Sequence, residues 1–203
     1  MNNLCIIPAR GGSKRIPRKN IKSFMGKPII AYAIEAALES KLFDEVMVST
    51  DDEEIAEIGR KFGAAVPFMR SKEAADDFAT TVDVLLEVLE DYKKQEIEFE
   101  NICCIYPTAA FVTKEKLLET YSKLTEESLD AVFPVLPFSY PIQRALKIDK
   151  NKLRFFYPEF ENSRSQDLEK AFHDAGQFYF IQTAQFKKEK SIFTENTDRK
   201  SVV

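Results

Sequence analysis

Residues 4–20 read LCIIPARGGSKRIPRKN, and this stretch contains most of what the sequence indicates about function. It begins with an apolar run, Leu4–Pro8, which predicts a short buried strand. The strand opens into a loop with two adjacent glycines, a serine and a cluster of cations. The basic residues of this loop are Arg10, Lys14, Arg15, Arg18 and Lys19. Open α/β folds bind ligands at the carboxyl ends of strands, where glycines let backbone N–H groups approach an anion and cations neutralise it. The stretch therefore predicts a polyphosphate site.

The rest of the chain alternates apolar runs with amphipathic patterns. The expected strands are 45–49, 65–67, 101–106, 130–136 and 177–181. The expected helices begin at Pro28, at Asp51 or Asp52, at residue 79 and at residue 114. Strands that alternate with helices are typical of an α/β fold whose helices cover both faces of the sheet. We therefore predict a three-layer αβα sandwich with a mainly parallel sheet.

Residues 137–172 have a different texture from the rest of the chain. They contain the short polar and aromatic segments PFSYPIQRALKID and FYPEFENSRSQDLEKAF, without the pattern of a further strand–helix unit. This texture predicts a β-rich insertion, or arm, within a single domain that covers residues 1–203. The main sheet is expected to resume at Gln177–Ile181, and the stretch from Lys187 onwards is polar and weakly patterned.

The composition excludes several classes of protein. The chain has 203 residues, which is enough for one domain with a substantial core. Its formal net charge is −4, whereas a nucleic-acid-binding domain is usually basic. Without a membrane-spanning apolar run or a signal-peptide pattern, the sequence predicts a cytoplasmic protein. Cys5, Cys103 and Cys104 lie in apolar runs without CxxC spacing, so we expect buried, reduced thiols and no zinc site.

The glycine-containing loop matches neither of the common phosphate-binding motifs. It lacks both GxxxxGK[ST] and GxGxxG. On composition alone, a solvated basic turn is an alternative to a phosphate site. The order of strand, basic loop, Lys19-Asn20 and helix favours the phosphate site.

Beyond these patterns, PARGGSKRIPRKN resembles the signature of cytidylyltransferases that activate nine-carbon and related keto-sugar acids, such as sialic acid. Three further segments are similar to the same family: VSTDDEEIAEIGRKFGA, RSKEAADDFATTVDVL and IYPTAAFV. Two others, FPVLPFSYPIQRALKI and AFHDAGQFYF, are most similar to the branch that acts on pseudaminic acid. The resemblance extends over nearly the whole chain.

The resemblance implies both a fold and an activity. The fold would be a nucleotide-diphosphosugar-transferase-like αβα sandwich, assembled as a homodimer through the inserted arm. The activity would be transfer of CMP from CTP to the anomeric hydroxyl of pseudaminic acid, with release of pyrophosphate and with Mg²⁺ as the cofactor. Two alternatives stay open: the same reaction on sialic or legionaminic acid, and a catalytically impaired CTP-binding protein.

The resemblance also implies which residues form the site. Arg10 and Lys19 would be catalytic, with Lys19 steadying the phosphate under attack. The nucleotide-binding residues would be Arg10, Gly11, Gly12, Ser13, Lys14, Lys19, Asn20, Arg70, Asp77, Ala79 and Thr81. The sugar-binding residues would be Tyr106, Gln143, Arg144, Arg164, His173, Asp174 and Gln177. Arg144 and Arg164 are the candidates for the sugar carboxylate, because arginine binds carboxylates through two parallel hydrogen bonds.

For several of these residues a structural role is the alternative. Thr81 would then serve only to start a helix, and Arg144 and Arg164 would form salt bridges at the rim of the site. His173 is the only histidine in the chain, and it would then be a structural residue rather than a ligand contact.

The sequence departs from the family pattern at two places. The sialic-acid branch has a glutamine before Pro-Thr, whereas this chain has Tyr106, which weakens a sialic-acid assignment. The family holds its metal with an Asp-x-Asp motif near the C-terminus, and the given sequence ends at Val203 before any such motif. Asp198 stands alone, so no metal ligand is assigned. We expect this metal-binding tail to be missing and Mg²⁺ to be held mainly by the triphosphate.

Overall fold

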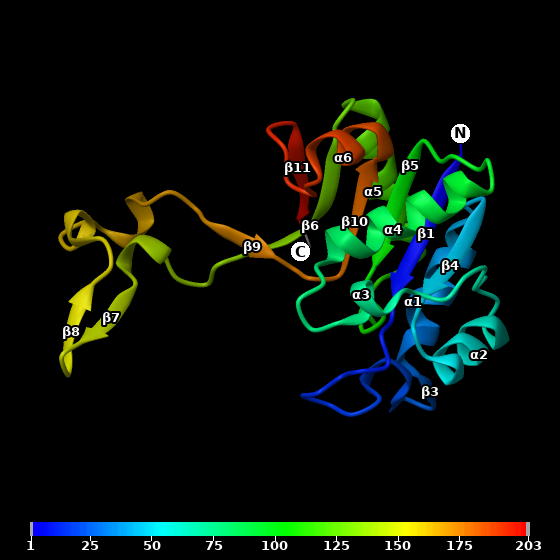
Figure 1. Cartoon of the computed structure of the whole chain (residues 1–203). Coiled ribbons are helices and arrows are strands. Elements are labelled where there is room, and N and C mark those ends of the chain that lie inside the picture. Colours follow the sequence, from blue (N-terminus) through cyan, green and yellow to red (C-terminus); the bar gives the residue numbers. More distant parts are fainter. Residues whose placement is uncertain (1, 202–203) are drawn as a thin grey trace. The chain divides into compact units, whose positions relative to one another are not determined.

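The computed structural model describes residues 2–201 and divides them into two compact units (Figure 1). Unit 1 runs to Phe133 and resumes over Gly176–Lys200, and it contains most of the secondary structure. Unit 2 is built mainly from Pro134–Ala175. Each unit is described by itself below.

Unit 1 is organised around a mixed β-sheet. Its strands are β1 (Asn3–Pro8), β4 (Glu45–Ser49), β5 (Asn101–Ile105), β6 (Ala131–Pro137), β10 (Phe178–Gln182) and β11 (Thr197–Ser201). They are ordered β11-β6-β10-β5-β1-β4. The last residues of β6 belong to unit 2, where they pair with a seventh strand of the sheet, β9 (Phe172–Asp174). A two-stranded hairpin of β2 (Ser23–Phe24) and β3 (Lys27–Pro28) lies outside this sheet.

The sheet is parallel only in part, which corrects the prediction of a mainly parallel sheet. β1 pairs in parallel with β4 and β5, as the alternating pattern predicted. β10 runs antiparallel between β5 and β6. Among the described residues, the segment between β6 and β10 contains no α-helix that could carry the chain back to the end of the sheet where β6 begins. The chain therefore re-enters the sheet at the end where β6 stops, and β10 must run in the direction opposite to β6.

Helices flank both faces of this sheet. They are α1 (Ile29–Ser40), α2 (Glu53–Lys61), α3 (Lys72–Ala75), α4 (Thr81–Lys94), α5 (Lys114–Glu126) and α6 (Thr183–Glu189). Cys5 and Ile7 of β1 belong to the same buried cluster as Ile34 of α1 and Leu117 of α5. Successive side chains of a strand point to opposite faces, so the neighbours of Cys5 and Ile7 face the other side. That side is covered by α4, which lies in front of β1 in Figure 1.

The helix boundaries follow from local sequence signals. The side chain of Asp52 accepts a hydrogen bond from the Ile55 amide and caps α2, and Thr113 caps α5 through the Lys116 amide. Thr80 and Asp83 form a reciprocal capping box at the start of α4. The predicted strand at 65–67 is wrong, because Ala65 forms only an isolated parallel bridge with Met47. The elements α3, α6 and β11 were not predicted from the sequence.

Unit 2 contains a β-hairpin and several short turns of helix. The hairpin pairs β7 (Leu146–Asp149) with β8 (Lys152–Phe155) around Lys150 and Asn151. Both turn residues have positive φ, as a two-residue hairpin turn of type I′ requires. The short helices are η2 (Ile142–Arg144), η3 (Pro158–Phe160) and η4 (Ser165–Asp167). Unit 2 thus includes the 137–172 segment whose composition differs from the rest of the chain.

All three cysteines are buried and free, as the sequence predicted. Burial raises the pKa of the Cys104 thiol to about 12, so this thiol stays protonated and unreactive at neutral pH. Over residues 2–201, none of the helices has both the length and the apolar character needed to span a bilayer.

Candidate functional site

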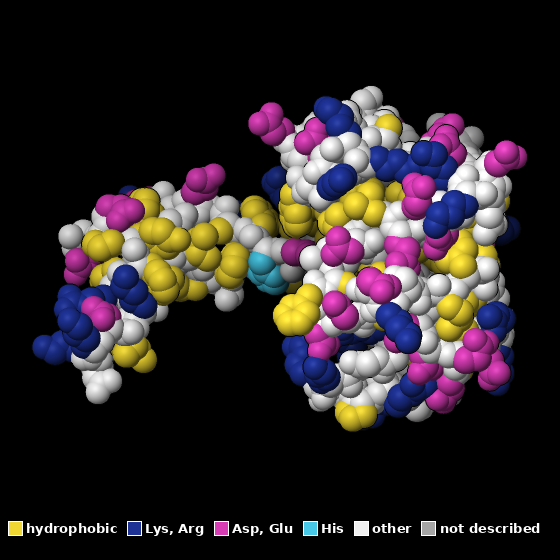
Figure 2. Space-filling view, viewed as in Figure 1, with side chains coloured by type: hydrophobic (Ala, Val, Ile, Leu, Met, Phe, Trp, Pro, Cys, Tyr) yellow, Lys and Arg dark blue, Asp and Glu magenta, His cyan; other side chains and the backbone are white. Residues whose placement is uncertain are grey.

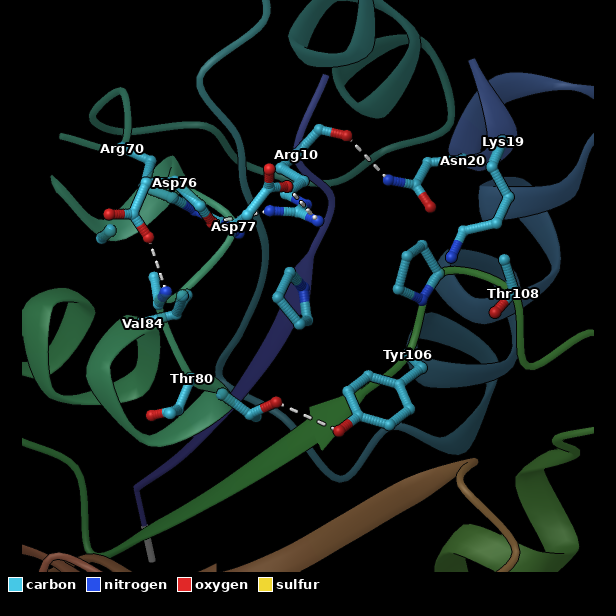
Figure 3. A pocket seen from close by; sticks show the side chains of 15 residues that line it. Arg10, Lys19, Asn20, Arg70, Asp76, Asp77, Thr80, Val84, Tyr106 and Thr108 are labelled. Carbon is cyan, nitrogen blue, oxygen red and sulfur yellow. Dashed lines mark hydrogen bonds and ion pairs between the residues drawn. The ribbon is translucent and has the colours of Figure 1, made fainter. Parts of the chain in front are cut away.

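A cavity of about 280 Å³ opens in unit 1 where β1 and β5 end (Figure 3). The predicted site residues that line it are Arg10, Lys19, Asn20, Arg70, Asp77, Ala79, Thr81 and Tyr106. They come from the loop after β1, the segment from Arg70 to the first residue of α4 (Thr81–Lys94), and the residue that follows β5. Segments far apart in the sequence thus meet at one end of the sheet, where open α/β folds bind their ligands.

Several lining residues were not singled out from the sequence. These are Pro8, Ala74, Asp76, Thr80, Val84, Pro107 and Thr108. Pro107 and Thr108 belong to the IYPTAAFV segment, and Asp76 directly precedes a predicted site residue. All seven lie in the segments that resemble the cytidylyltransferase family, and this was the only signal that pointed to them.

The cations of the first loop have different partners. Arg10 and Lys19 line the cavity, and Figure 3 shows both side chains extending into it. Lys14 forms an ion pair with Asp77. Arg18 forms ion pairs with two carboxylates at the start of α2 instead. Arg18 is therefore engaged at α2 and is not among the residues that line the cavity.

The glycines and the serine of the loop lie beyond Arg10 and are not among the lining residues. The amide of Gly11 donates to Asp51 Oδ1 at 2.8 Å. A Cβ atom at Gly11 would lie 2.7 Å from Asp52 Oδ2, so only glycine allows this close approach. Gly12 has open space at the corresponding position, and the Ser13 amide donates to the Gly11 carbonyl. Gly11 therefore has a packing requirement that Gly12 does not share.

Arg70 is a buried cation at the cavity wall, with 8% of its surface exposed. Its Nε donates to Ser49 Oγ at 3.0 Å and its Nη2 to the Ser49 carbonyl at 2.6 Å. Burial lowers the pKa of Arg70, and the charges of Asp51 and Glu87 oppose that shift. An arginine keeps its proton even so. The cavity wall thus carries a fixed positive charge with a defined orientation.

Two aspartates shape the segment before α4. Asp76 Oδ1 accepts hydrogen bonds from the amides of Phe78 and Ala79, which folds this segment into a tight turn. Arg10 donates to the Asp76 carbonyl at 2.6 Å, and its Nη2 lies 3.1 Å from Asp77 Oδ1. The hydrogen bond from Lys14 lowers the pKa of the Asp77 carboxyl, and Arg10 adds to the effect. Asp77 is therefore ionised at neutral pH and forms ion pairs with both Arg10 and Lys14.

Tyr106 links the end of β5 to the start of α4. Its hydroxyl lies 3.0 Å from Thr81 Oγ1, as the dashed line in Figure 3 marks. Its ring packs edge-on against Tyr179, and its amide donates to the Gln177 carbonyl at 2.9 Å. Thr81 is thus more than a helix-start residue, because its hydroxyl has a specific partner in the cavity.

Asn20 and Gln177 each leave a buried acceptor unpaired among the described residues. The Asn20 side chain is 5% exposed, and its Nδ2 donates to the Arg10 carbonyl at 3.0 Å. Its Oδ1 has no hydrogen-bond partner, and the same is true of Gln177 Oε1. Gln177 is not a lining residue of the cavity. Because unpaired buried acceptors are costly, Asn20 presents an acceptor to which a bound N–H or O–H group can donate.

The remaining predicted sugar-binding residues belong to unit 2. Gln143 donates to the Glu169 carbonyl at 3.0 Å, and Arg144 donates to the Ser163 carbonyl at 3.3 Å. Arg164 is largely exposed, and its Nε lies 2.7 Å from the Asp167 carboxylate.

The histidine of unit 2 and its neighbour lie on β9. His173 packs edge-on against Phe138, and its Nδ1 lies 2.9 Å from the Asp174 carbonyl. Both residues are exposed.

The residues around the cavity do not form a ligand set for a metal ion. Within residues 2–201, no three His, Cys, Asp or Glu side chains come together as metal ligands. Asp76 is engaged by backbone amides and Asp77 by Arg10 and Lys14. Of the two aspartates that line the cavity, Asp76 is thus already hydrogen-bonded and Asp77 already ion-paired.

Comparisons with known proteins agree on one family. A family model described as Cytidylyltransferase matches residues 4–200. The pseudaminic acid cytidylyltransferase of Campylobacter jejuni is 47% identical over 95% of this chain and 84% of its own length. The N-acylneuraminate cytidylyltransferase of Streptococcus agalactiae is 33% identical over 97% of this chain and 47% of its own length.

A solved structure shares the fold. It is that of a CMP:2-keto-3-deoxy-manno-octonic acid synthetase complexed with CTP, and it matches with a TM-score of 0.70 at 17% sequence identity. The match covers 100% of this chain and 91% of the other. At this identity the likeness shows the fold alone, a mixed α/β sheet flanked by helices.

Proposed function

The chain belongs to the cytidylyltransferase family, and from this premise we propose that it transfers CMP from CTP to the anomeric hydroxyl of pseudaminic acid. The observation that carries this choice of sugar is the similarity to pseudaminic acid cytidylyltransferase over nearly the whole chain. The cavity supports the nucleotide half of the reaction. It combines two loop cations with a buried arginine at the end of the sheet.

In the proposed reaction, the anomeric oxygen attacks the α-phosphorus of CTP. A new P–O bond forms to the sugar, the bond between the α-phosphorus and the bridging oxygen breaks, and pyrophosphate leaves. The hydroxyl proton is released. Such a transfer depends on positioning and charge neutralisation rather than on covalent catalysis. Arg10 and Lys19 are the cations that we assign to the phosphates, because both reach into the cavity.

The remaining roles follow the chemistry of each side chain. We propose that Gly11, Gly12, Ser13 and Lys14 approach the triphosphate and that Asn20 accepts a hydrogen bond from the nucleotide. Arg70, Asp77, Ala79 and Thr81 would surround the cytosine and ribose. For the sugar we propose Tyr106, Gln177, Gln143, His173 and Asp174, with Arg144 or Arg164 binding the carboxylate.

We propose Mg²⁺ as the cofactor, carried by the phosphates of CTP. Mg²⁺ keeps several waters and is usually bound through one or two carboxylates plus substrate phosphates. The described residues around the cavity do not supply such carboxylates in a free state, so no step is assigned to the ion here. Three buried, reduced cysteines support a cytoplasmic location, where thiols stay reduced.

Pyrophosphate release measures the proposed reaction directly. The chain is incubated with CTP, Mg²⁺ and, in parallel, pseudaminic, sialic or legionaminic acid. We expect the highest kcat/KM with pseudaminic acid, and a preference for either other acid overturns the choice of sugar. CTP binding seen by calorimetry together with background pyrophosphate release for all three acids would favour the impaired CTP-binding protein instead.

The Asp77 carboxylate ion-pairs with cations that we assign to the triphosphate. Removing its charge should therefore free Arg10 and Lys14 for an added anion. We expect Asp77→Asn to bind inorganic triphosphate more tightly than the unmodified protein in calorimetry, with an unchanged melting temperature because the pair is exposed. Asp91→Asn removes a carboxylate from a similar exposed pair on α4 and is the matched control. Unchanged or weaker triphosphate binding by Asp77→Asn would contradict the assignment.

We also propose that the protein is a homodimer that uses the apolar surface of unit 2. The exposed large apolar residues of this unit are Phe138, Tyr140, Ile142, Leu146, Ile148, Leu153, Phe156, Tyr157 and Phe172. Figure 2 shows many hydrophobic side chains on unit 2. A concentration of this kind on a short segment is typical of an interaction surface. The resemblance implies that the family forms its dimer through an inserted arm, and we propose that unit 2 is this arm.

The hairpin gives this dimer a direct test. Ile148 and Leu153 lie opposite each other on β7 and β8 and are 77% and 70% exposed. We expect Ile148→Asp to lower the mass seen by light scattering from about twice 23.3 kDa to that of one chain. Lys152→Asp adds a carboxylate to the same hairpin and should leave the mass unchanged. The same mass for the unmodified chain and Ile148→Asp would rule out this surface.

A further inference from the structure

Arg18 occupies a distinctive place in the loop that follows β1. It immediately precedes η1 (Lys19–Ile21), a single helical turn that carries Lys19 and Asn20. Its backbone is left-handed, with φ 54° and ψ 31°, which few residues other than glycine adopt. The Ile21 amide donates to the Arg18 carbonyl at 3.1 Å. The conformation of Arg18 therefore sets where the turn begins and which way it faces.

The side chain of Arg18 holds this conformation in place. Its Nη1 donates to Asp52 Oδ2 at 2.5 Å and its Nη2 to Asp52 Oδ1 at 3.0 Å, so both carboxylate oxygens are bound. Nη2 also binds the carboxylate of Glu54. A two-point contact between arginine and carboxylate fixes orientation as well as distance. These hydrogen bonds lower the pKa of Asp52 and raise the pKa of Arg18.

The carboxylate that Arg18 binds is itself fixed to the scaffold. Asp52 Oδ1 accepts a hydrogen bond from the Ile55 amide at 3.1 Å, because Asp52 is the N-cap of α2. The preceding residue, Asp51, accepts from the Gly11 amide near the start of the loop. Both ends of the loop are thus attached to the same two-residue corner between β4 and α2.

We propose that Arg18 is a positioning residue that acts through Lys19. By binding Asp52 and Glu54, it holds η1 so that the Lys19 side chain extends into the cavity. Arg18 is not among the lining residues of the cavity, and its guanidinium group already has two carboxylate partners. The inference rests on the proposed function, because Lys19 is assigned there to the phosphate under attack.

A double-mutant cycle separates positioning from direct phosphate binding. We expect Arg18→Ala to lower kcat about 10- to 10²-fold, since small displacements of a catalytic group have effects of this size. The Kd for CTP in calorimetry should stay within a few-fold of the unmodified value. In a Lys19→Ala background, Arg18→Ala should cause no further loss of kcat. Additive losses, or a loss of CTP or inorganic triphosphate affinity that matches the loss of kcat, would overturn the proposal.

Two further variants sharpen this cycle. Arg18→Lys keeps one positive charge for the carboxylates and should recover part of the lost kcat. Arg60→Ala removes an exposed arginine whose partner is Glu53 on the same helix, and it should leave kcat unchanged. A similar loss of kcat in Arg60→Ala would indicate that α2, rather than the Arg18 contact, is responsible.

Hydrogen exchange tests the same contact without any activity. The amides of Ile21 and Lys22 donate to the carbonyls of Arg18 and Lys19, and the Lys19 amide donates to the Ile16 carbonyl just before the turn. We expect faster exchange of these amides in Arg18→Ala than in the unmodified chain and in Arg60→Ala. Unchanged exchange would overturn the proposal even in an active enzyme. If the unmodified chain releases no pyrophosphate with any of the three sugar acids, the proposed function fails, and exchange still decides whether Arg18 holds the turn.

Discussion

Replacing Lys19 by alanine is expected to lower kcat about 10²- to 10³-fold while the Kd for CTP changes only a few-fold. The reason lies in the reaction proposed for the cavity. Negative charge shifts towards the leaving pyrophosphate as the bond to the α-phosphorus breaks. A cation beside the phosphate under attack stabilises this transition state more than it stabilises the bound substrate. The loss of that cation therefore lowers kcat.

The structure gives Lys19 the environment that such a role needs. Its side chain extends into the cavity, and the neighbouring Asn20 is tied to the backbone of Arg10. A fixed charge in a preformed site needs no reorganisation during the reaction. Arg10, by contrast, is already bound to Asp77 and the Asp76 carbonyl. Lys19 has no ion-pair partner among the described residues, so its charge is available to a ligand.

Steady-state kinetics and calorimetry together decide between the two possible roles of Lys19. Lys22→Ala is the control, because it removes an exposed lysine from the residue that follows η1. An equal loss in kcat and in CTP affinity for Lys19→Ala would mean that Lys19 stabilises the bound substrate as much as the transition state. Equal effects of Lys19→Ala and Lys22→Ala would remove Lys19 from the catalytic machinery.

The elements of unit 1 were predictable where one local signal dominates. The apolar run at the start of the chain and the NICCI run became β1 and β5, and helical spacing from Val82 to Leu89 identified α4. The direction of β10 was not predictable. A buried strand reads as an apolar run whether its neighbours are parallel or antiparallel, because both of its faces are covered. The direction of β10 depends only on the path of the chain that precedes it, and that path is a property of the tertiary structure.

The same distinction applies to the site. Arg10 and Lys19 could be placed at the cavity because they belong to the basic loop that follows β1, whereas Tyr106 could be placed there only through the family resemblance. The partners of Arg18 could not, since 34 residues separate it from Asp52 in the sequence. From composition alone, every cation of the loop after β1 had the same predicted role, which was to neutralise a bound polyphosphate. Side-chain geometry separates four of the five: Arg10 and Lys19 lie at the cavity, Lys14 at Asp77, and Arg18 at the start of α2.

Arg70→Lys is expected to weaken CTP binding by about 10- to 10²-fold while leaving the binding of inorganic triphosphate nearly unchanged. The proposal places Arg70 beside the cytosine and ribose, and inorganic triphosphate contains neither. Lysine keeps the positive charge but lacks the planar group whose hydrogen bonds have fixed directions. We therefore expect a loss of affinity only for the ligand that contains the cytosine and ribose which the guanidinium group contacts.

Arg70 also supports the fold, so its stability must be measured alongside binding. Its side chain donates to both the hydroxyl and the carbonyl of Ser49. The carbonyl also accepts from the Ala9 amide and stays paired, whereas the hydroxyl would lose its donor. We expect a loss of about 1–3 kcal/mol in unfolding free energy for Arg70→Lys, seen as a lower melting temperature. Binding is then compared at a temperature well below the melting transition of the variant.

Comparing the two ligands separates the structural role of Arg70 from base recognition. If Arg70 only supports the wall of the cavity, its replacement disturbs the whole site, and CTP and inorganic triphosphate lose affinity together. If it contacts the base or ribose, CTP alone loses affinity. Arg60→Ala, an exposed arginine on α2, should change neither. Because the buried guanidinium group keeps its charge and its orientation is set by Ser49, we expect the selective loss.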